Sequence, residues 1–266
     1  MYQSFAKSLV ASALCMSSLV ASAQDAAVPK HLQLARDFVT NTKQENNEYS
    51  NRNIYTKTPT DLFASKWVVH TDCSGFVEDI LRRSGSGVLE QIGTKKFKTR
   101  YSLLDMHASM MKSEAFARLD HVTDLKPGDI VSWRYIDLRG HHITTGHILF
   151  VDSEPVKIKP RKPFVNGLDQ YEFWMIDVSQ EAKSRDDTRF VSDAALRDEN
   201  ESKGAQGGTV SSPNFKGVGR GRIRLYVEPA SGEVKGAAFS FDKAKFHEQG
   251  PDWLIVMGRP KVVAAN

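Results

Sequence analysis

The chain has 266 residues, of which 40% are hydrophobic and 26% are charged, so it can form one globular domain with elaborations or two small domains. Its formal net charge of +4 comes without a dense stripe of lysine and arginine, which argues against a nucleic-acid-binding protein. Beyond the N-terminal segment, no stretch is apolar for long enough to span a membrane.

The N-terminal residues 1–23 are predicted to be a secretory signal peptide. Lys7 supplies the positive charge, and the apolar or small run Ser8–Val20 is too short for a transmembrane helix. Ala21 and Ala23 then form a small-x-small cleavage site. Cleavage after Ala23 predicts a periplasmic or secreted protein.

The mature chain, residues 24–266, is expected to hold one cysteine, Cys73. The other cysteine, Cys15, lies in the signal, and Leu14 before it is not the small residue that a lipid-attachment site requires. A lone cysteine cannot form an intramolecular disulfide, and an exported protein exposes its thiols to oxidation. Cys73 is therefore a buried small hydrophobe, part of a metal site, or a nucleophile.

The first half of the chain predicts helices. Leu34, Ala35, Phe38 and Val39 recur at helical spacing within His31–Lys43, and the polar stretch 44–53 that follows is predicted to be a loop. A second helix is predicted to begin at Asp72 or Cys73 and to end at Gly85, and a third to cover 100–116. His107 falls on an apolar face of the third helix, which favours a core histidine.

The second half predicts strands, and the order of elements favours an α+β fold with an antiparallel sheet. A Lys126–Asp129 turn should lead into the first strand, and 198–213 is predicted to be a mobile loop. Arg222, Arg224 and Tyr226 are expected on the outer face of their strand. The predicted strands are Ile130–Trp133, Gly146–Asp152, Tyr171–Ser179, 220–228 hairpin-paired with 233–241, and Trp253–Pro260.

The position of Cys73 at the start of a helix favours a nucleophile over a packing residue. Free backbone amides and the helix dipole stabilise a thiolate there, which predicts a lowered pKa for the thiol. A cysteine nucleophile needs a base and a group that orients the base. His147 opens a strand directly after Gly146, so its imidazole can project from the sheet edge toward the start of a packed helix.

A metal site is the weakest alternative. His141, His142, His147 and Asp152 could be drawn as ligands, but Cys73 lacks a Cys-x-x-Cys partner. Adjacent histidines on an extended segment also point in opposite directions. No metal or other cofactor is expected.

Three ordered blocks resemble the signatures of the NlpC-type cell-wall cysteine peptidases, which are papain-like enzymes. The blocks are "TDCSGFV", "LKPGDIVSW" and "TGHILFVD", and the resemblance extends from about Val68 to Asp152. It implies a papain-like fold with N-terminal helices on an antiparallel sheet, here as one domain over 24–266. An insert at about 153–170 and a β extension at about 210–266 would elaborate that domain.

The resemblance implies that Cys73 is the nucleophile and His147 the base. The third residue would lie on the next strand, where Asp177 is the candidate; Ser179 on that strand and Asp152 at the end of the His147 strand are alternatives.

Four further residues are expected near the substrate or the oxyanion. Asp72 and Ser74 flank the nucleophile, whose own backbone amide would help to hold the oxyanion. Trp67 and Tyr55 are candidates for lining the cleft, because the family's usual Tyr-x-x-Gly-Gly segment before the cysteine is replaced here by "LFASKWVVH". The cleft segment therefore departs from the family at the place where substrate identity is set.

The implied activity is hydrolysis of an amide bond in peptidoglycan stem peptides, with the γ-D-glutamyl–diamino acid bond as the example. An acyltransferase or esterase on the same scaffold is an alternative, because fold does not determine function. A catalytically degenerate module that only binds wall fragments is another. Peptidoglycan or a peptide is thus the expected partner.

Overall fold

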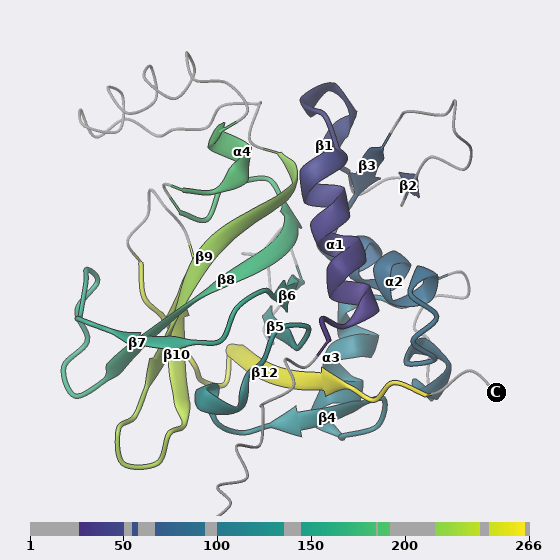
Figure 1. Cartoon of the computed structure of the whole chain (residues 1–266). Helices are drawn as coiled ribbons and strands as arrows, with labels where there is room; N and C mark the ends of the chain where they lie inside the picture. Colours follow the sequence, from purple (N-terminus) through teal and green to yellow (C-terminus); the bar gives the residue numbers. More distant parts are fainter. Residues whose placement is uncertain are drawn as a thin grey trace, which may run out of the picture.

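The molecule places its three long helices on one side of a large, strongly curved sheet (Figure 1). The structure is a computed structural model. The predicted signal peptide and the predicted loop 198–213 lie outside the part that it describes. That part comprises residues 27–50, 55–57, 67–93, 100–135, 145–184, 186–191, 216–239 and 245–263.

The helices are α1 (Lys30–Asn41), α2 (Cys73–Arg83), α3 (Leu103–Met111) and the short α4 (Thr188–Val191). All three predicted helices are present, but the third is shorter than predicted. Ser102 caps the start of α3 in a capping box, and Ser113, with a φ of 53°, turns the chain out of the helix. The predicted helical tail therefore becomes a strand that begins at Phe116.

The main sheet has nine strands, and every neighbouring pair is antiparallel, which confirms the α+β class with an antiparallel sheet. Its order is β11-β10-β9-β8-β6-β5-β12-β4, with β7 paired to β8 beside this path. The strands are β4 (Phe116–Leu119), β5 (Ile130–Tyr135), β6 (Gly146–Val151), β7 (Val156–Ile158), β8 (Asp169–Ser179), β9 (Gly217–Val227), β10 (Val234–Ala238), β11 (His247–Glu248) and β12 (Trp253–Pro260).

A second, three-stranded sheet contains the first departure from prediction. Its order is β1 (Asn47–Tyr49), β3 (Val68–Thr71) and β2 (Tyr55–Lys57), with β1 parallel to β3. The stretch predicted as a loop thus contributes a 3₁₀ turn (Gln44–Asn46) and β1. A distant partner orders it, because the Asn47 side-chain amide donates to the Val218 carbonyl and accepts from the Val218 amide, at 2.9 and 2.7 Å.

The insert expected between two strands of the core is itself part of the sheet. β7 pairs with the first residues of β8, and the chain between them folds back over β9. There the Tyr226 hydroxyl donates to the Pro163 carbonyl at 2.7 Å. Tyr226 shares a face of β9 with Arg222 and Arg224, as expected, but its ring is completely buried and packs edge-on against Phe246.

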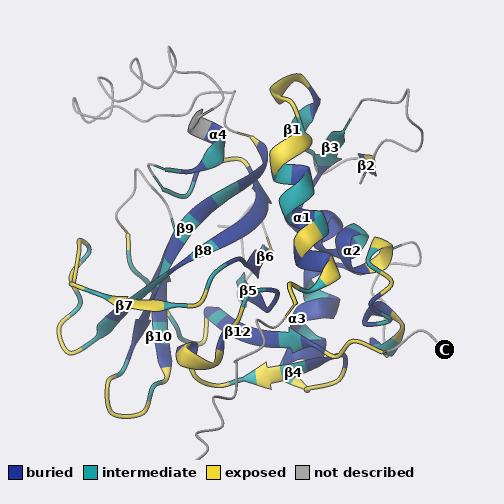
Figure 2. Ribbon diagram, in the orientation of Figure 1, coloured by how far each residue is buried: buried dark blue, intermediate teal, exposed yellow. Residues whose placement is uncertain are grey.

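Two apolar cores lie on opposite faces of the main sheet. Along β6, Ile148 and Phe150 pack toward the helices, and Leu149 and Val151 pack on the other face. Both sets are buried, as the dark inner faces of the sheet show (Figure 2). Within the described ranges, no helix combines the length and apolar character needed to cross a bilayer. Cys73, at the start of α2, belongs to the core on the helix side, together with Ile148 of β6.

Candidate functional site

Cys73 is the first residue of α2, as the sequence predicts, and a carboxylate caps that helix. Asp72 Oδ1 accepts from the Gly75 amide at 2.7 Å and from the Ser74 hydroxyl at 2.9 Å. Asp72 Oδ2 accepts from Arg100 at 3.1 Å. The two residues that flank the thiol therefore hold the helix start in place, and both are buried.

The predicted lowering of the thiol pKa is wrong. Burial and the neighbouring Asp72 carboxylate raise the pKa of Cys73 to about 12, although the backbone amides of Ile148 and Ser74 bond the sulfur and act in the opposite direction. The cysteine is only 6% exposed, so loss of hydration outweighs the helix N-terminus. At neutral pH, Cys73 is therefore a thiol that needs a base to become a nucleophile.

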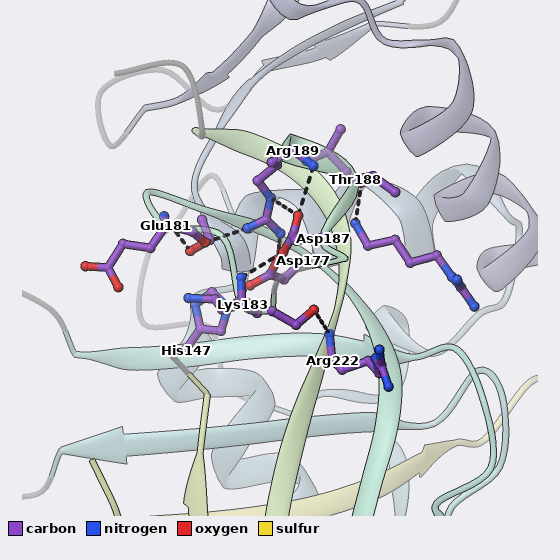
Figure 3. A network of polar contacts seen from close by, with 12 residues as sticks. His147, Asp177, Glu181, Lys183, Asp187, Thr188, Arg189 and Arg222 are labelled. Atoms are coloured by element: carbon purple, nitrogen blue, oxygen red, sulfur yellow. Dashed lines mark hydrogen bonds and ion pairs between the residues drawn. The ribbon is translucent and has the colours of Figure 1, made fainter. Parts of the chain in front are cut away.

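His147 bonds Asp177, which is the contact that the sequence proposes. Its Nε2 lies 2.7 Å from Asp177 Oδ2, and the carboxylate side chain is completely buried (Figure 3). An ionised carboxylate can only accept, so Nε2 carries the proton and Nδ1 carries the lone pair. Burial lowers the pKa of His147 against the opposing effect of Asp177, which makes the resting imidazole neutral.

Asp177 is ionised because a buried guanidinium faces it. Burial alone would raise the pKa of this carboxyl, but Arg189 and the hydrogen bond from His147 bring it down to about 2. Arg189 Nη2 donates to Asp177 Oδ1, so the two carboxylate oxygens serve two different partners. Asp177 is thus held between Arg189 and His147, and each partner bonds one carboxylate oxygen.

The strand that carries His147 also contacts the cysteine. The residue after His147 is Ile148, whose backbone amide bonds the Cys73 sulfur. Among the described residues, no hydrogen bond joins the thiol to the imidazole, and none engages Nδ1. The thiol therefore lies beside the backbone of the residue that follows His147.

The two alternatives for the third residue have other partners. Asp152 bonds the guanidinium groups of Arg36 and Arg220, with Arg36 Nε at 2.6 Å. The Ser179 hydroxyl accepts from the Glu181 amide at 3.2 Å. Neither bonds His147, so Asp177 is the partner of the imidazole.

No group of three or more metal-binding side chains comes together in the part of the chain that the structure covers. Two of the four residues drawn as a metal site, His141 and His142, lie outside that part. Asp152 is tied to its two arginines, and His147 is bonded to Asp177.

The two aromatic candidates for the cleft have different outcomes. Trp67 packs edge-on against Phe38 at 5.0 Å between ring centroids and borders the core beneath the helices. The backbone of Tyr55 lies in β2, opposite His70, and its side chain is outside the described set. Trp67 is thus placed as a packing residue, and the role of Tyr55 stays a prediction.

Sequence reasoning missed Tyr49 and Arg189. The half-buried Tyr49 has its pKa raised by burial and by the nearby Cys73, Asp72 and Asp177, so its phenol stays protonated beside the site. No local pattern marks either residue. A signal for Arg189 does exist in the alternate glycines of β9, because glycine inside a strand often marks the close approach of another segment.

Comparison with known proteins adds no functional information. No family model matches the chain, and no solved structure matches it. A similar protein is the uncharacterized protein R653 of Acanthamoeba polyphaga mimivirus, which is 27% identical over 198 residues. The aligned part covers 71% of this chain and 77% of the viral protein.

Proposed function

We propose that the chain is an exported, papain-like cysteine hydrolase of the NlpC type that cleaves an amide bond in peptidoglycan stem peptides. The observation that supports this most strongly is the His147 Nε2–Asp177 Oδ2 bond of 2.7 Å on strands beside the helix that begins with Cys73. The γ-D-glutamyl–diamino acid bond is the first bond to test. The substrate class and the periplasmic or secreted location rest on the resemblance and the predicted signal peptide.

The protonation states define the first step. Cys73 begins as a thiol, and His147 Nδ1 takes its proton as the sulfur attacks the carbonyl carbon of the amide. The carbonyl oxygen then becomes an oxyanion, for which the backbone amide of Cys73 is the proposed donor. The ionised Asp177 stabilises the imidazolium that forms.

The remaining steps return every group to its starting state. The tetrahedral intermediate collapses, the carbon–nitrogen bond breaks, and the leaving amine takes the proton from His147. A water molecule then gives a proton to His147 Nδ1 and attacks the thioester carbon. The second collapse releases the carboxylic acid and restores the Cys73 thiol with that proton.

A second candidate, a non-catalytic module that binds wall fragments, is favoured by one observation. The thiol is buried, its pKa is raised, and no described hydrogen bond links it to His147. Such a module would bind stem peptides without turnover. An acyltransferase or esterase on the same residues is a third possibility: the first differs in the acceptor of the acyl group, and the second in the leaving group, which is an alcohol.

Digestion of purified peptidoglycan, with mass analysis of the fragments, tests these proposals. Wild type is expected to release peptide fragments, and Cys73→Ala is expected to release none while keeping its circular dichroism spectrum. An added amine acceptor incorporated into the product would indicate transfer. Full activity of Cys73→Ala would overturn the mechanism, and binding without cleavage by wild type would favour the module.

A further inference from the structure

The connection between β8 and β9 forms a buried ionic cluster behind the His147–Asp177 pair (Figure 3). Arg189, at 1% side-chain exposure, is its centre. Its Nη1 donates to the Glu181 carbonyl at 2.7 Å, its Nη2 donates to Asp177, and its Nε lies 3.4 Å from Asp187 Oδ1. The guanidinium is thus held on three sides and has little freedom to turn.

Asp187 is the second carboxylate beside the Arg189 guanidinium. Its carboxylate is completely buried and accepts from the backbone amides of Lys183 and Arg189, at 2.8 and 3.0 Å. These amide bonds hold the loop itself, so the position of the guanidinium is set by backbone as well as by charge. Removal of Arg189 would leave two buried carboxylates close together, which disfavours their shared ionisation.

The opposing strand is shaped to admit this cluster. Gly219 pairs directly with Asp177 across β8 and β9. A Cβ at Gly219 would overlap Arg189, coming within 2.7 Å of Cγ and 2.8 Å of Cζ. A Cβ at Gly221 would likewise overlap the Asp187 carboxylate, with its Cγ at 3.1 Å. Two strand positions thus lack side chains where the Arg189–Asp187 pair needs the space.

We propose that Arg189 is a positioning residue that holds the Asp177 carboxylate ionised and aims its Oδ2 at His147, so that the imidazole keeps its proton on Nε2 and its lone pair on Nδ1. This inference rests on the proposed function, because the tautomer matters only if His147 is the base. Arg189 touches neither the thiol nor the expected substrate position. Its effect reaches the reaction through Asp177.

Other charged groups around the pair affect its titration and must stay constant in a test. Lys183 lies in the same connection and, like Arg189, lowers the pKa of His147. The ionisable surroundings also include Cys73 at the start of α2, its N-cap Asp72, Tyr49 on β1, and Glu181 and Asp187 in the connection. A change confined to Arg189 substitutes none of these residues.

Nitrogen NMR of the His147 imidazole in the full chain measures the tautomer and its titration without a substrate. We expect wild type to show a single tautomer with the proton on Nε2. Arg189→Met should populate both tautomers and move the titration of His147 away from that of wild type, because a nearby cation is lost and Asp177 is no longer held ionised. Arg189→Lys should restore the titration but not the full preference for one tautomer, because lysine keeps the charge without the forked geometry.

A matched control is Arg220→Met, which also removes a guanidinium from a buried carboxylate, that of Asp152, and should leave the His147 signals unchanged. An unchanged tautomer and titration in a folded Arg189→Met protein would overturn the proposal. If that variant does not fold, wild-type signals in Arg189→Lys would overturn it equally.

Failure of the proposed function is distinguishable from failure of this inference. Wild type that leaves wall peptides intact, combined with the expected NMR response, would reject the hydrolase and keep the positioning role. If wild type does hydrolyse them, Arg189→Met should lower kcat by about 100-fold, the scale of a small misplacement of a catalytic group. Hydrolysis by wild type without the NMR response would reject the positioning role alone.

Discussion

Gly219→Ala adds one methyl group behind the His147–Asp177 pair. Gly219 faces Asp177 across the β8–β9 ladder, and its backbone needs no left-handed conformation, so the substitution tests space alone. The new Cβ would lie 2.7 Å from Arg189 Cγ, whereas ordinary van der Waals contact begins at 3.4 Å. The Cγ of Arg189 would therefore have to retreat by roughly 0.7 Å, and Nε of the guanidinium, which lies nearer still to the new Cβ, by more.

That retreat is costly because the guanidinium would have to leave its polar partners. Arg189 is held by Asp177, Asp187 and the Glu181 carbonyl. Overpacking of this kind lowers the free energy of unfolding by about 1–3 kcal/mol. If the chain hydrolyses wall peptides as proposed, a shift of the same size in Asp177 should reduce that activity by about 100-fold, because the imidazole loses its fixed acceptor.

Urea denaturation and peptidoglycan digestion measure the two effects separately. The matched control is Gly250→Ala, since a Cβ at Gly250 meets nothing within 4 Å. We expect its free energy of unfolding to stay within about 0.5 kcal/mol of wild type. Equal stability and equal activity of the two alanine variants would refute the packing argument.

Three further predictions concern the thiol, acid stability and the core. Asp72→Asn should lower the pKa of Cys73 below about 12 and speed its alkylation by iodoacetamide, because it removes a negative charge beside the thiol while asparagine can still cap α2. An unchanged midpoint in the curve of alkylation rate against pH would contradict this. Burial, with nearby Arg134, lowers the pKa of His107 to about 4, so the folded state favours the neutral imidazole. This contribution to the free energy of unfolding is complete above pH 6.5, and about 3 kcal/mol of it should be lost as the pH falls to 4. Urea titrations should show that extra loss in wild type and not in His107→Gln. Phe150→Ala should lower the free energy of unfolding by about 3–5 kcal/mol in the same measurement, because it removes a completely buried ring. A loss below about 1 kcal/mol would show that neighbouring side chains fill the cavity.

Local pattern was sufficient for most elements of this fold. Apolar spacing predicts α1 and α2, and a Lys-Pro-Gly-Asp turn before an apolar run predicts β5. These signals work because the period of a helix or strand appears within a few neighbouring residues. The strand β1 escaped prediction because its order comes from Asn47 bonding to Val218, far away in the chain.

The sequence by itself determined the candidate chemistry: a lone cysteine at a helix start, a histidine that opens a strand, and Asp177 among three possible partners. Only the tertiary structure decided among those partners. Asp152 bonds Arg36, whereas Asp177 bonds the His147 imidazole, and residues distant in the sequence make both contacts. It also reversed the expected pKa of Cys73. A helix N-terminus is a local feature that sequence reveals, whereas the loss of water around the sulfur comes from strands and helices packed over it.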